Sequence, residues 1–230
     1  MKLIKRAACS DTAIYDTHPF LVKDVLFSAI LVAANEGLLQ IAQVIEAPDR
    51  DRDIVAGWIE RGRGGLEACW DPHRQLCLDY NLRTGKLVQA RTVAGFAPLI
   101  SGGSSRERLE KLHQTFDSLD FTGNPKLRWP LPTSTGFSES SFDSRSYWRG
   151  PVWPVVDWLL WWSLVRAGEL ERATQLRRAS LDQIIQGGFA EYFEPSSGAP
   201  LGSIEQSWTA AVALDWLVAR NLQPVTMDAA

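Results

Sequence analysis

The chain has 230 residues, 45% of them apolar, and a formal net charge of −3 at pH 7. A chain of this length and composition can bury a sizeable core as one large domain or two small ones. Its lysines and arginines are interspersed with acidic residues, which excludes the basic footprint of a nucleic-acid-binding protein. Three cysteines (Cys9, Cys69 and Cys77) and three scattered histidines have no metal-ligand spacing, so we expect neither a metal nor a cofactor.

The sequence contains no segment typical of export or of a membrane anchor. The first residues, MKLIKRAACSDTAIYD, meet polar side chains before any long apolar run, unlike a secretory signal. The most apolar stretch, residues 25–45, is interrupted by polar residues and glycine, which argues against a membrane span: Ser28, Asn35, Glu36, Gly37 and Gln40. We therefore expect a cytoplasmic protein that does not contact a membrane.

Helical periodicity dominates the N-terminal half. Apolar residues recur at helical spacing over residues 19–45, with Pro19 suited to the first turn, and predict one long helix or two halves that meet near Gly37. A second helix is predicted from residue 51 to the stop signal at Asp71-Pro72.

A hairpin and a third helix are predicted next. Alternating apolar residues from Leu76 to Leu82, followed by Thr84-Gly85, are typical of a short β-hairpin. The segment Gly102-Gly103-Ser104-Ser105 ends in a serine that can cap a helix over residues 106–116.

The second half begins with a long loop. Residues 117–149 are rich in Pro, Ser, Thr and Gly but also carry six aromatic residues, which indicates an ordered and functional loop. Three further helices are predicted over residues 151–168, 169–188 and 203–220.

The predicted fold class is all-α. Six helices that pair in sequence, with long aromatic loops at alternate connections, supply half of what an α/α toroid needs. In such a toroid the inner helices line a pocket and the long loops cover it. A plain helical bundle remains the alternative, because periodicity alone does not exclude it.

Tryptophan is the unusual residue in the composition. Eight of the ten tryptophans lie from Trp129 onward. Such an excess fits a packed core, or a cleft that stacks against the flat faces of sugar rings. The same region places Glu191, Glu194 and Glu205 among aromatic residues and turn formers, which raises the question of whether one of them is catalytic.

Two blocks carry a family resemblance. SYWRGPVWPVVDWLL (residues 146–160) and GFAEYFEPSSGAPLGSIEQSWTAAVALDWL (residues 188–217) resemble the C-terminal half of glycoside hydrolase family 63, above all its bacterial glucosylglycerate and mannosylglycerate hydrolases, and more distantly the inverting trehalases. The resemblance extends to RTVAGFAPL, WPLPTS and FLVKDVLFSAIL and so covers most of the chain. It implies an (α/α)6 barrel that cleaves an α-glycosidic bond with inversion, using one carboxylic acid and one carboxylate.

The resemblance implies that Glu191 is the general base that activates water. Its surroundings agree, because Phe189, Tyr192 and Phe193 flank it and can partly desolvate a carboxylate that must accept a proton. The alternative is a surface glutamate that pairs with a neighbouring arginine.

The other two glutamates have weaker claims. Glu194 precedes Pro195 in a predicted turn, where we expect it to be solvated. Relatives carry a glutamate that touches the sugar near position 205, so we rank Glu205 first as a sugar-binding residue and second as a helix N-terminal carboxylate. Gln206 can offer both a donor and an acceptor to sugar or aglycone hydroxyls.

The YWRGPVW block is implied by the resemblance to line the substrate pocket. Its predicted contacts are aromatic ring faces and a backbone amide near the aglycone, supplied by Tyr147, Trp148, Gly150 and Trp153. Arg149 has two interpretations of equal weight, since it can hold a carboxylate of the substrate or brace a loop acid such as Asp143.

The helix that follows this block is predicted to serve mainly the core. Trp158, Trp161 and Trp162 are expected to be buried there rather than to contact substrate. Asp157 departs from the asparagine that is common among relatives at this position, which affects the polar network but not the base.

No general acid is recognisable. In the family this aspartate precedes the blocks found here, and Asp11, Asp16 and Asp24 are the only upstream candidates, none in suitable surroundings. We therefore expect residues 1–230 to form the C-terminal portion of one glycosidase domain, completed by an N-terminal half or by oligomerisation. A sugar-binding or interaction module without turnover is the competing hypothesis, and a six-helix scaffold is the third.

Overall fold

The computed structural model describes residue 18 and residues 20–219. Seven α-helices lie in this part of the chain: α3 (Val25–Val44), α4 (Asp49–Ala68), α5 (Ala97–Ser101), α6 (Arg106–Phe116), α7 (Pro154–Arg166), α8 (Leu170–Gly187) and α9 (Ser207–Val218). The remaining elements are two-residue strands and two 3-10 helices: β1 (Val22–Lys23), β2 (Trp70–Asp71), β3 (Leu76–Cys77), β4 (Tyr80–Asn81), β5 (Lys86–Leu87), η1 (Val93–Phe96), η2 (Tyr147–Arg149), β6 (Tyr192–Phe193) and β7 (Pro200–Leu201). The prediction of an all-α fold is confirmed for the described residues.

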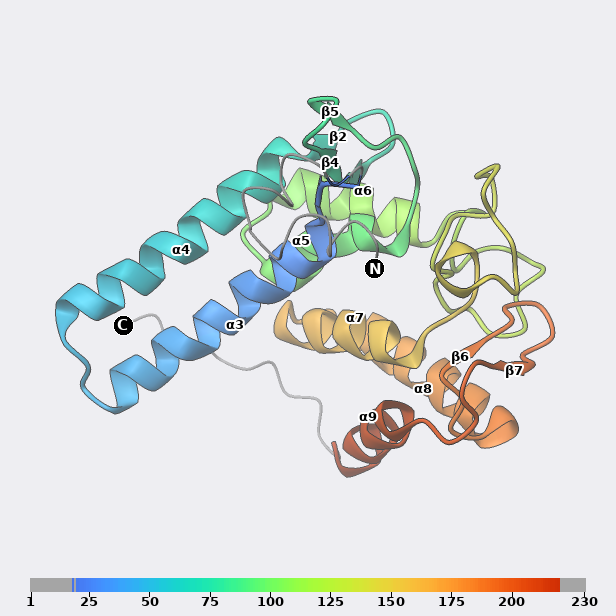
Figure 1. Cartoon of the computed structure of the whole chain (residues 1–230). Helices are drawn as coiled ribbons and strands as arrows, with labels where there is room; N and C mark the ends of the chain where they lie inside the picture. Colours follow the sequence, from blue (N-terminus) through green and yellow to red (C-terminus); the bar gives the residue numbers. More distant parts are fainter. Residues whose placement is uncertain (1–17, 19, 220–230) are drawn as a thin grey trace.

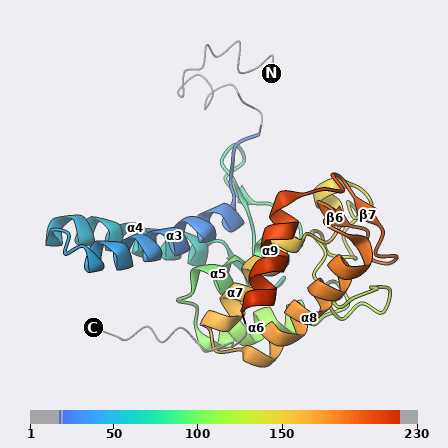
Figure 2. The same cartoon turned by 90° about the horizontal axis from the view of Figure 1, so that it is seen from below.

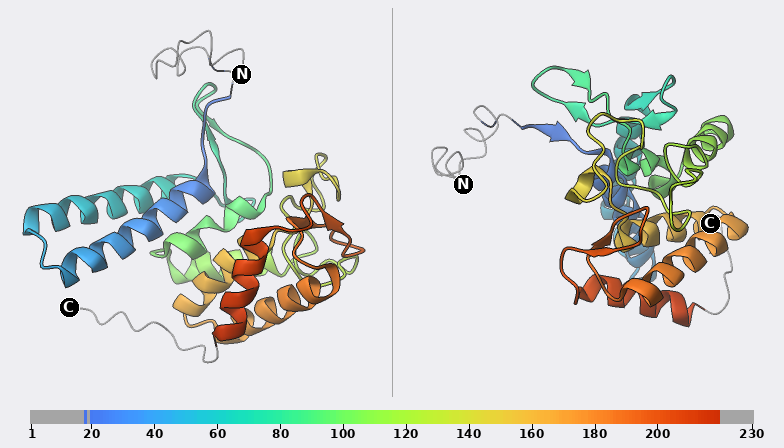
Figure 3. Two further views of the ribbon diagram at one scale, coloured as in Figure 1. Left: turned by 60° about the horizontal axis from the view of Figure 1, so that its bottom comes forward. Right: turned by 90° about the vertical axis from the view of Figure 1, so that its right-hand side faces the viewer.

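The helices follow one another in a row that contains two antiparallel pairs, α3–α4 and α7–α8 (Figure 1). α3 packs on α5, α5 on α7 and α7 on α9, while α4 and α8 pair with α3 and α7 respectively. The α3–α4 pair extends to one side of the body, as Figures 2 and 3 show. The α3–α4 pair is therefore the end of the row, and no described helix packs on its surface that faces away from α5.

Several helix limits agree with the local sequence signals. The hydroxyl of Ser105 accepts a hydrogen bond from the Arg108 amide and caps α6, as predicted. Pro154 occupies the first turn of α7, where its missing N–H costs nothing. Gly188 ends α8 with φ of 75°, a left-handed conformation that glycine adopts without strain.

The first described helix begins later than predicted. Strand β1 precedes it and pairs with β4, with Val22 opposite Asn81 and Lys23 opposite Tyr80. Asp24 then caps α3 by accepting a hydrogen bond from the Phe27 amide at 2.8 Å. From Val25 to Val44 the helix is continuous, without a break at Gly37. Pro19, predicted in its first turn, lies outside the described residues.

The predicted hairpin is in fact two hairpins. Leu76 belongs to β3, which pairs with β2, whereas Tyr80 belongs to β4, which pairs with β5 across the Thr84-Gly85 turn. The five-residue helix α5 was not predicted, because it is too short to show a helical period. The last predicted helix also begins later, at Ser207, since the four residues before it form part of a loop.

The loop over residues 117–149 is tied to the body by polar contacts. The Arg91 guanidinium pairs with Asp120 at 2.7 Å, and the Arg91 amide donates to Glu139 Oε1 at 2.9 Å. Inside the loop the rings of Phe137 and Phe142 stack with centroids 4.5 Å apart. These contacts agree with the prediction of an ordered loop.

Two clusters of buried apolar side chains form the core. The larger surrounds α7, whose Val156, Leu160 and Leu164 contact α8, α9 and the loop aromatics. The smaller lies among α3, α4 and α5 and is joined to α7 by the buried carboxylate of Glu36, which pairs with Arg63 and, at 2.6 Å, with Arg166.

By length and composition alone, α3 could cross a bilayer, contrary to the expectation from its polar interruptions. Much of its apolar surface is exposed, including Phe27, Leu31 and Ile41. Its partner α4, however, carries nine charged residues along its length.

Candidate active site

A β-bridge joins the two blocks that carry the predicted site. The Val152 amide donates to the Phe193 carbonyl at 2.9 Å, and the Phe193 amide donates to the Val152 carbonyl at the same distance. Strand β6 pairs on its other side with β7, where Tyr192 lies opposite Leu201. The segment before α7 and the segment after α8 are thereby held side by side (Figure 1).

Four aromatic rings pack together at this junction, and we call Tyr147, Trp148, Trp153 and Tyr192 the aromatic wall. The Trp148 ring stacks on the Trp153 ring, with centroids 3.9 Å apart and an interplanar angle of 3°. The Tyr192 ring also stacks on Trp153, with centroids 4.6 Å apart and an interplanar angle of 23°. Two parallel rings at these distances cannot share one face of an indole, so they cover opposite faces. Tyr147 meets Trp153 edge-on at 5.0 Å.

The members of the aromatic wall differ in exposure. Trp153 is 1% exposed, whereas Trp148 is 41% and Tyr147 50% exposed. Only the latter two therefore present broad surface to a ligand. Trp153 supports the wall from behind, and its predicted contact with substrate stays a prediction.

Backbone contacts hold the exposed rings in place. Tyr147 has φ of 42°, a strained conformation for a bulky residue that its surroundings must enforce. The Trp148 carbonyl accepts a hydrogen bond from Thr135 Oγ1 at 3.0 Å. The Gly150 amide donates to Ser134 Oγ at 3.0 Å, and a side chain at position 150 would meet the Asp143 carbonyl at 2.4 Å. The Gly150 amide, predicted near the aglycone, is thus already engaged.

Glu191 directly precedes strand β6, whose Tyr192 belongs to the aromatic wall, and its side chain is half-buried. Its backbone amide donates to the Ser203 carbonyl at 2.7 Å, and its Oε2 accepts from the Ser203 amide at 3.2 Å. Oε1 has no hydrogen-bond partner among the described residues. One carboxylate oxygen is therefore anchored, while the other can accept a proton from a water molecule.

Glu194 was predicted to be solvated, but the structure buries it. It is 7% exposed, and its Oε2 accepts hydrogen bonds from the Ser196 amide at 3.1 Å and from the amide and hydroxyl of Ser197 at 2.6 and 2.5 Å. Burial alone would raise the pKa of Glu194, but these hydrogen bonds outweigh it and hold the pKa below its usual value. Glu194 therefore stabilises the turn through its Oε2, which accepts all three of these hydrogen bonds.

Glu205 and Gln206 lie in the connection between β7 and α9. The Gln206 amide donates to the Phe189 carbonyl at 2.7 Å, which ties this connection to the segment before Glu191. The Glu205 side chain is exposed, and no side chain caps α9, so the capping alternative for Glu205 is not observed. The two side chains make no hydrogen bond to another described residue and stay predicted sugar contacts.

Arg149 is exposed and faces its own loop. Its Nε and Nη2 donate to Ser146 Oγ at 3.2 and 2.9 Å, and Nη2 lies 3.9 Å from Asp143 Oδ2. Of its two interpretations, this geometry favours bracing of the loop. A substrate carboxylate would have to displace these weak contacts.

One helical turn beyond Trp153, Asp157 is fully buried. Its Oδ2 accepts from Ser180 Oγ at 3.4 Å, and its Oδ1 has no partner among the described residues. Burial raises the pKa of this carboxyl well above its usual value and so favours the neutral form, which resembles asparagine in shape and charge. Trp161 is buried as predicted, while Trp158 and Trp162 are only half-buried.

From the sequence, Tyr192 was expected only to flank Glu191 and desolvate it, and Gly202 and Ser203 were not expected in the site. Tyr192 adjoins the predicted base and could have been included on its aromatic character. The serine and glycine act through the backbone, which no side-chain pattern records. Of the upstream acids, Asp24 caps α3, while Asp11 and Asp16 lie outside the described residues.

A protein metal site needs several ligating side chains that converge on one point. In the described part of the chain no group of three or more His, Cys, Asp or Glu side chains has a suitable arrangement. Cys69 and Cys77 are free thiols, and burial raises the pKa of Cys77 to about 12. Cys9 lies outside the described residues.

A row of helix pairs with an aromatic wall beside a carboxylate is the architecture of a carbohydrate-active α/α domain, and comparisons with known proteins agree. Residues 1–209 match the family described as mannosylglycerate hydrolase MGH1-like glycoside hydrolase domain. The chain therefore belongs to this branch of glycoside hydrolase family 63.

Individual relatives support the same assignment. The glucosylglycerate hydrolase of Mycolicibacterium hassiacum is 40% identical over 214 residues, which cover 93% of this chain and 48% of that protein. The crystal structure of the mannosylglycerate hydrolase of Thermus thermophilus in complex with glucose superposes with a TM-score of 0.86 at 33% identity, over 94% of this chain and 53% of that one. The same enzyme has been solved with Tris and D-glycerate.

A more distant structure shows the fold alone. The neutral trehalase of Saccharomyces cerevisiae has a TM-score of 0.58 at 17% identity, over 87% of this chain and 38% of that one. The predicted (α/α)6 toroid is thus confirmed as the fold to which the described helices belong. The chain spans about half the length of the family 63 relatives it matches.

Proposed function

We propose that this chain supplies the general-base half of an inverting α-glycoside hydrolase that acts on glucosylglycerate or mannosylglycerate. The main evidence is the carboxylate of Glu191, which lies at the edge of the aromatic wall. Its Oε2 is anchored by a hydrogen bond, whereas its Oε1 is free to contact a water molecule. The activities of the M. hassiacum and T. thermophilus relatives support the substrate class.

The chemistry follows from inversion. Glu191 Oε1 takes a proton from a water molecule, whose oxygen attacks the anomeric carbon on the face opposite the leaving group. The bond to the glycosidic oxygen breaks, and that oxygen must receive a proton from a carboxylic acid about 6.5–9.5 Å from the base. Tyr147 and Trp148 offer ring surface to the apolar face of the sugar.

The polar contacts are assigned by position. Glu205 and Gln206 follow the loop that anchors Glu191, where they can accept and donate hydrogen bonds to sugar hydroxyls. Arg149 can attract the glycerate carboxylate once its contacts to Ser146 and Asp143 open.

The general acid comes from the part of the domain that this chain does not span. Without it the departing alkoxide is a poor leaving group, and a positioned proton donor is worth about 10²–10⁴ in rate. We therefore propose a complementing half as partner, and we expect negligible turnover by the 230-residue chain alone.

Sugar release distinguishes this proposal from a binding module. Glucose and mannose release from the two glycerate glycosides is measured for the chain and for a version completed with the remaining half of the M. hassiacum enzyme, each with and without Glu191→Gln. We expect activity only in the completed enzyme with Glu191 intact. Robust turnover by the chain alone would refute the missing-acid argument, and an active Glu191→Gln variant would refute the base. Sugar binding by the completed enzyme without turnover would favour the binding module.

A further inference from the structure

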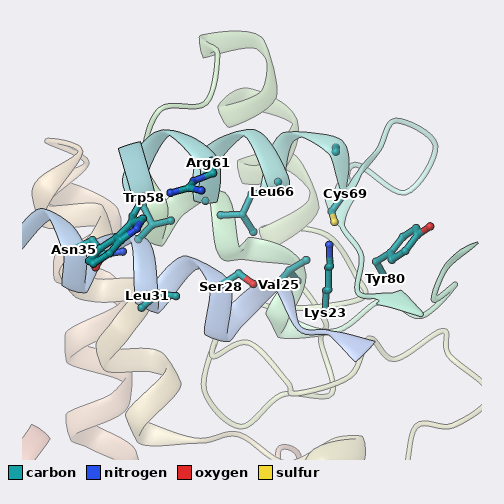
Figure 4. Close-up of a pocket in the computed structure, with 14 residues that line it drawn as sticks. Lys23, Val25, Ser28, Leu31, Asn35, Trp58, Arg61, Leu66, Cys69 and Tyr80 are labelled. Atoms are coloured by element: carbon teal, nitrogen blue, oxygen red, sulfur yellow. The ribbon is translucent and has the colours of Figure 1, made fainter. Parts of the chain in front are cut away.

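A cavity of about 790 Å³ lies between α3 and α4, away from the aromatic wall, and we call it the α3–α4 groove (Figure 4). Leu31 and Asn35 line it from α3, and Trp58 and Gly65 line it from α4. Lys23, Cys69 and Tyr80 border one end. Leu31 is 62% and Trp58 45% exposed, so apolar surface on both helices is open to solvent.

The groove lies at the end of the helix row. α3 packs on α5, and the Glu36 carboxylate of α3 pairs with Arg166 of α7 on that inner side. The row of described helices has no further member beyond the α3–α4 pair. Solvent-exposed apolar patches of this kind typically mark an interaction site.

The charged side chains that line the groove are all positive. Two cations, Lys23 and Arg61, belong to its lining, and the described residues that line it include no carboxylate. Neither cation forms an ion pair with a described acidic residue. An occupant that leaves these cations uncompensated would be disfavoured, so the complementary surface should carry acidic groups.

These features lead to one occupant. We propose that the α3–α4 groove seats an amphipathic helix from the half of the toroid that this chain does not span, with carboxylates opposite Lys23 and Arg61; the choice of partner rests on the proposed function. A third helix packs well against two antiparallel helices, since its side-chain ridges fit the groove between them. The 48% coverage of the M. hassiacum relative leaves a segment long enough to supply such a helix.

Two other occupants fit less well. A second copy of this chain would bring the cations of one groove towards those of the other. A bilayer would have to accept α4, which packs along α3 and carries nine charged residues.

The test measures binding and uses the portion of the M. hassiacum enzyme that the match leaves uncovered, co-expressed with the tagged 230-residue chain. We expect a 1:1 complex by size-exclusion chromatography with light scattering. Gly65→Trp should weaken the complex at least tenfold by filling the groove. Gly64→Trp is the matched control, because it lies on the same helix outside the lining and, as at Gly65, an added Cβ meets no atom within 4 Å.

A charge pair tests the second part of the proposal. Arg61→Glu should weaken binding at least fivefold at low salt, whereas Arg50→Glu, exposed on the same helix but outside the groove, should not. Slower alkylation of Cys69 in the wild-type complex, measured by peptide mass spectrometry, should confirm that the groove end is covered even if a variant folds poorly.

The contrary outcomes are distinct. The proposal is overturned by absence of a complex, by equal binding of Gly65→Trp and Gly64→Trp, by a chain dimer that Gly65→Trp dissolves, or by groove-dependent binding to phosphatidylglycerol vesicles. A complex that hydrolyses no glycoside would leave the groove assignment intact and refute the proposed function instead.

Discussion

Gly202 lies against the carboxylate of Glu191, so that a methyl group at position 202 would stand 2.5 Å from Glu191 Oε2 and 2.6 Å from Tyr192 Cε1. Its φ of 69° also belongs to the left-handed region. Only glycine therefore fits at position 202, where the loop between β7 and α9 passes the proposed base. Ser203, which follows Gly202, supplies the amide that anchors Glu191.

Replacing Gly202 by alanine should therefore move Glu191. In the completed enzyme we expect kcat to fall at least about tenfold, because misplacement of a catalytic group by about 1 Å can cost up to about 10²-fold. Gly188→Ala is the control, since Gly188 shares the positive φ of 75° but an added Cβ there meets no atom within 4 Å. Equal losses in the two variants would show that backbone strain alone, and not contact with Glu191, is responsible.

Glu194 makes a prediction about stability and pH. Its folded-state pKa is depressed, so its contribution is present above the usual glutamate value of about 4.3 and is lost as the pH falls through the folded pKa. Glu194→Gln should lower the free energy of unfolding in urea by about 1–3 kcal/mol at pH 7, with a smaller difference at pH 3. Glu60→Gln, an exposed change on α4, should have little effect at either pH. A pH-independent loss at position 194 would contradict the ionic role.

The sequence predicted those features of the fold that depend on local signals. Ser105 sets the start of α6 as expected, because a cap acts within one turn. The helix predicted from Pro151 begins instead at Pro154, the next proline along the chain, because residues 151–153 are extended and bridge to Phe193 through Val152. The start of α3 was wrong, since it depends on the pairing of Val22 with Asn81, a contact between distant segments that helical periodicity does not contain. The short α5 carries too few residues to show a period.

The resemblance selected Glu191, Tyr147 and Trp148 as site residues, and the structure brings their two segments together at the Val152–Phe193 bridge. The turn before Pro195 led us to expect Glu194 in solvent, because the hydrogen bonds from Ser196 and Ser197 form only in the folded turn. The covered faces of Trp153 depend on Tyr192, which the Val152–Phe193 bridge brings into stacking distance. Such roles follow from tertiary contacts and not from residue type.

The pKa of the buried Asp157 carboxyl is shifted in the opposite direction to that of Glu194, so the predicted pH dependence of stability is also opposite. Its folded-state pKa is raised, so the folded protein holds the proton more tightly, and the stability present below pH of about 4 declines as the pH rises through the folded pKa. Asp157→Asn keeps the shape without the charge. We expect it to increase the free energy of unfolding at pH 8 relative to wild type, by about 1–3 kcal/mol, and to have little effect at pH 4. Asp182→Asn, exposed on α8, serves as control; destabilisation by Asp157→Asn at pH 8 would show that the ionised form is the native one.

The aromatic wall predicts a separation between stability and ligand binding. Trp153 is 1% exposed with both faces covered, so Trp153→Ala should lower the free energy of unfolding by about 3–5 kcal/mol. Trp148 is 41% exposed and loses mainly one stacked contact, so Trp148→Ala should cost only about 0.5–1.5 kcal/mol. Urea unfolding measures both values. In the completed enzyme Trp148→Ala should nevertheless raise KM for the glycerate glycosides at least about fivefold, with Trp148→Phe intermediate, because its exposed indole surface is available to the sugar. If Trp148→Ala left KM unchanged while Trp153→Ala retained full stability, the roles assigned to the two tryptophans would have to be exchanged.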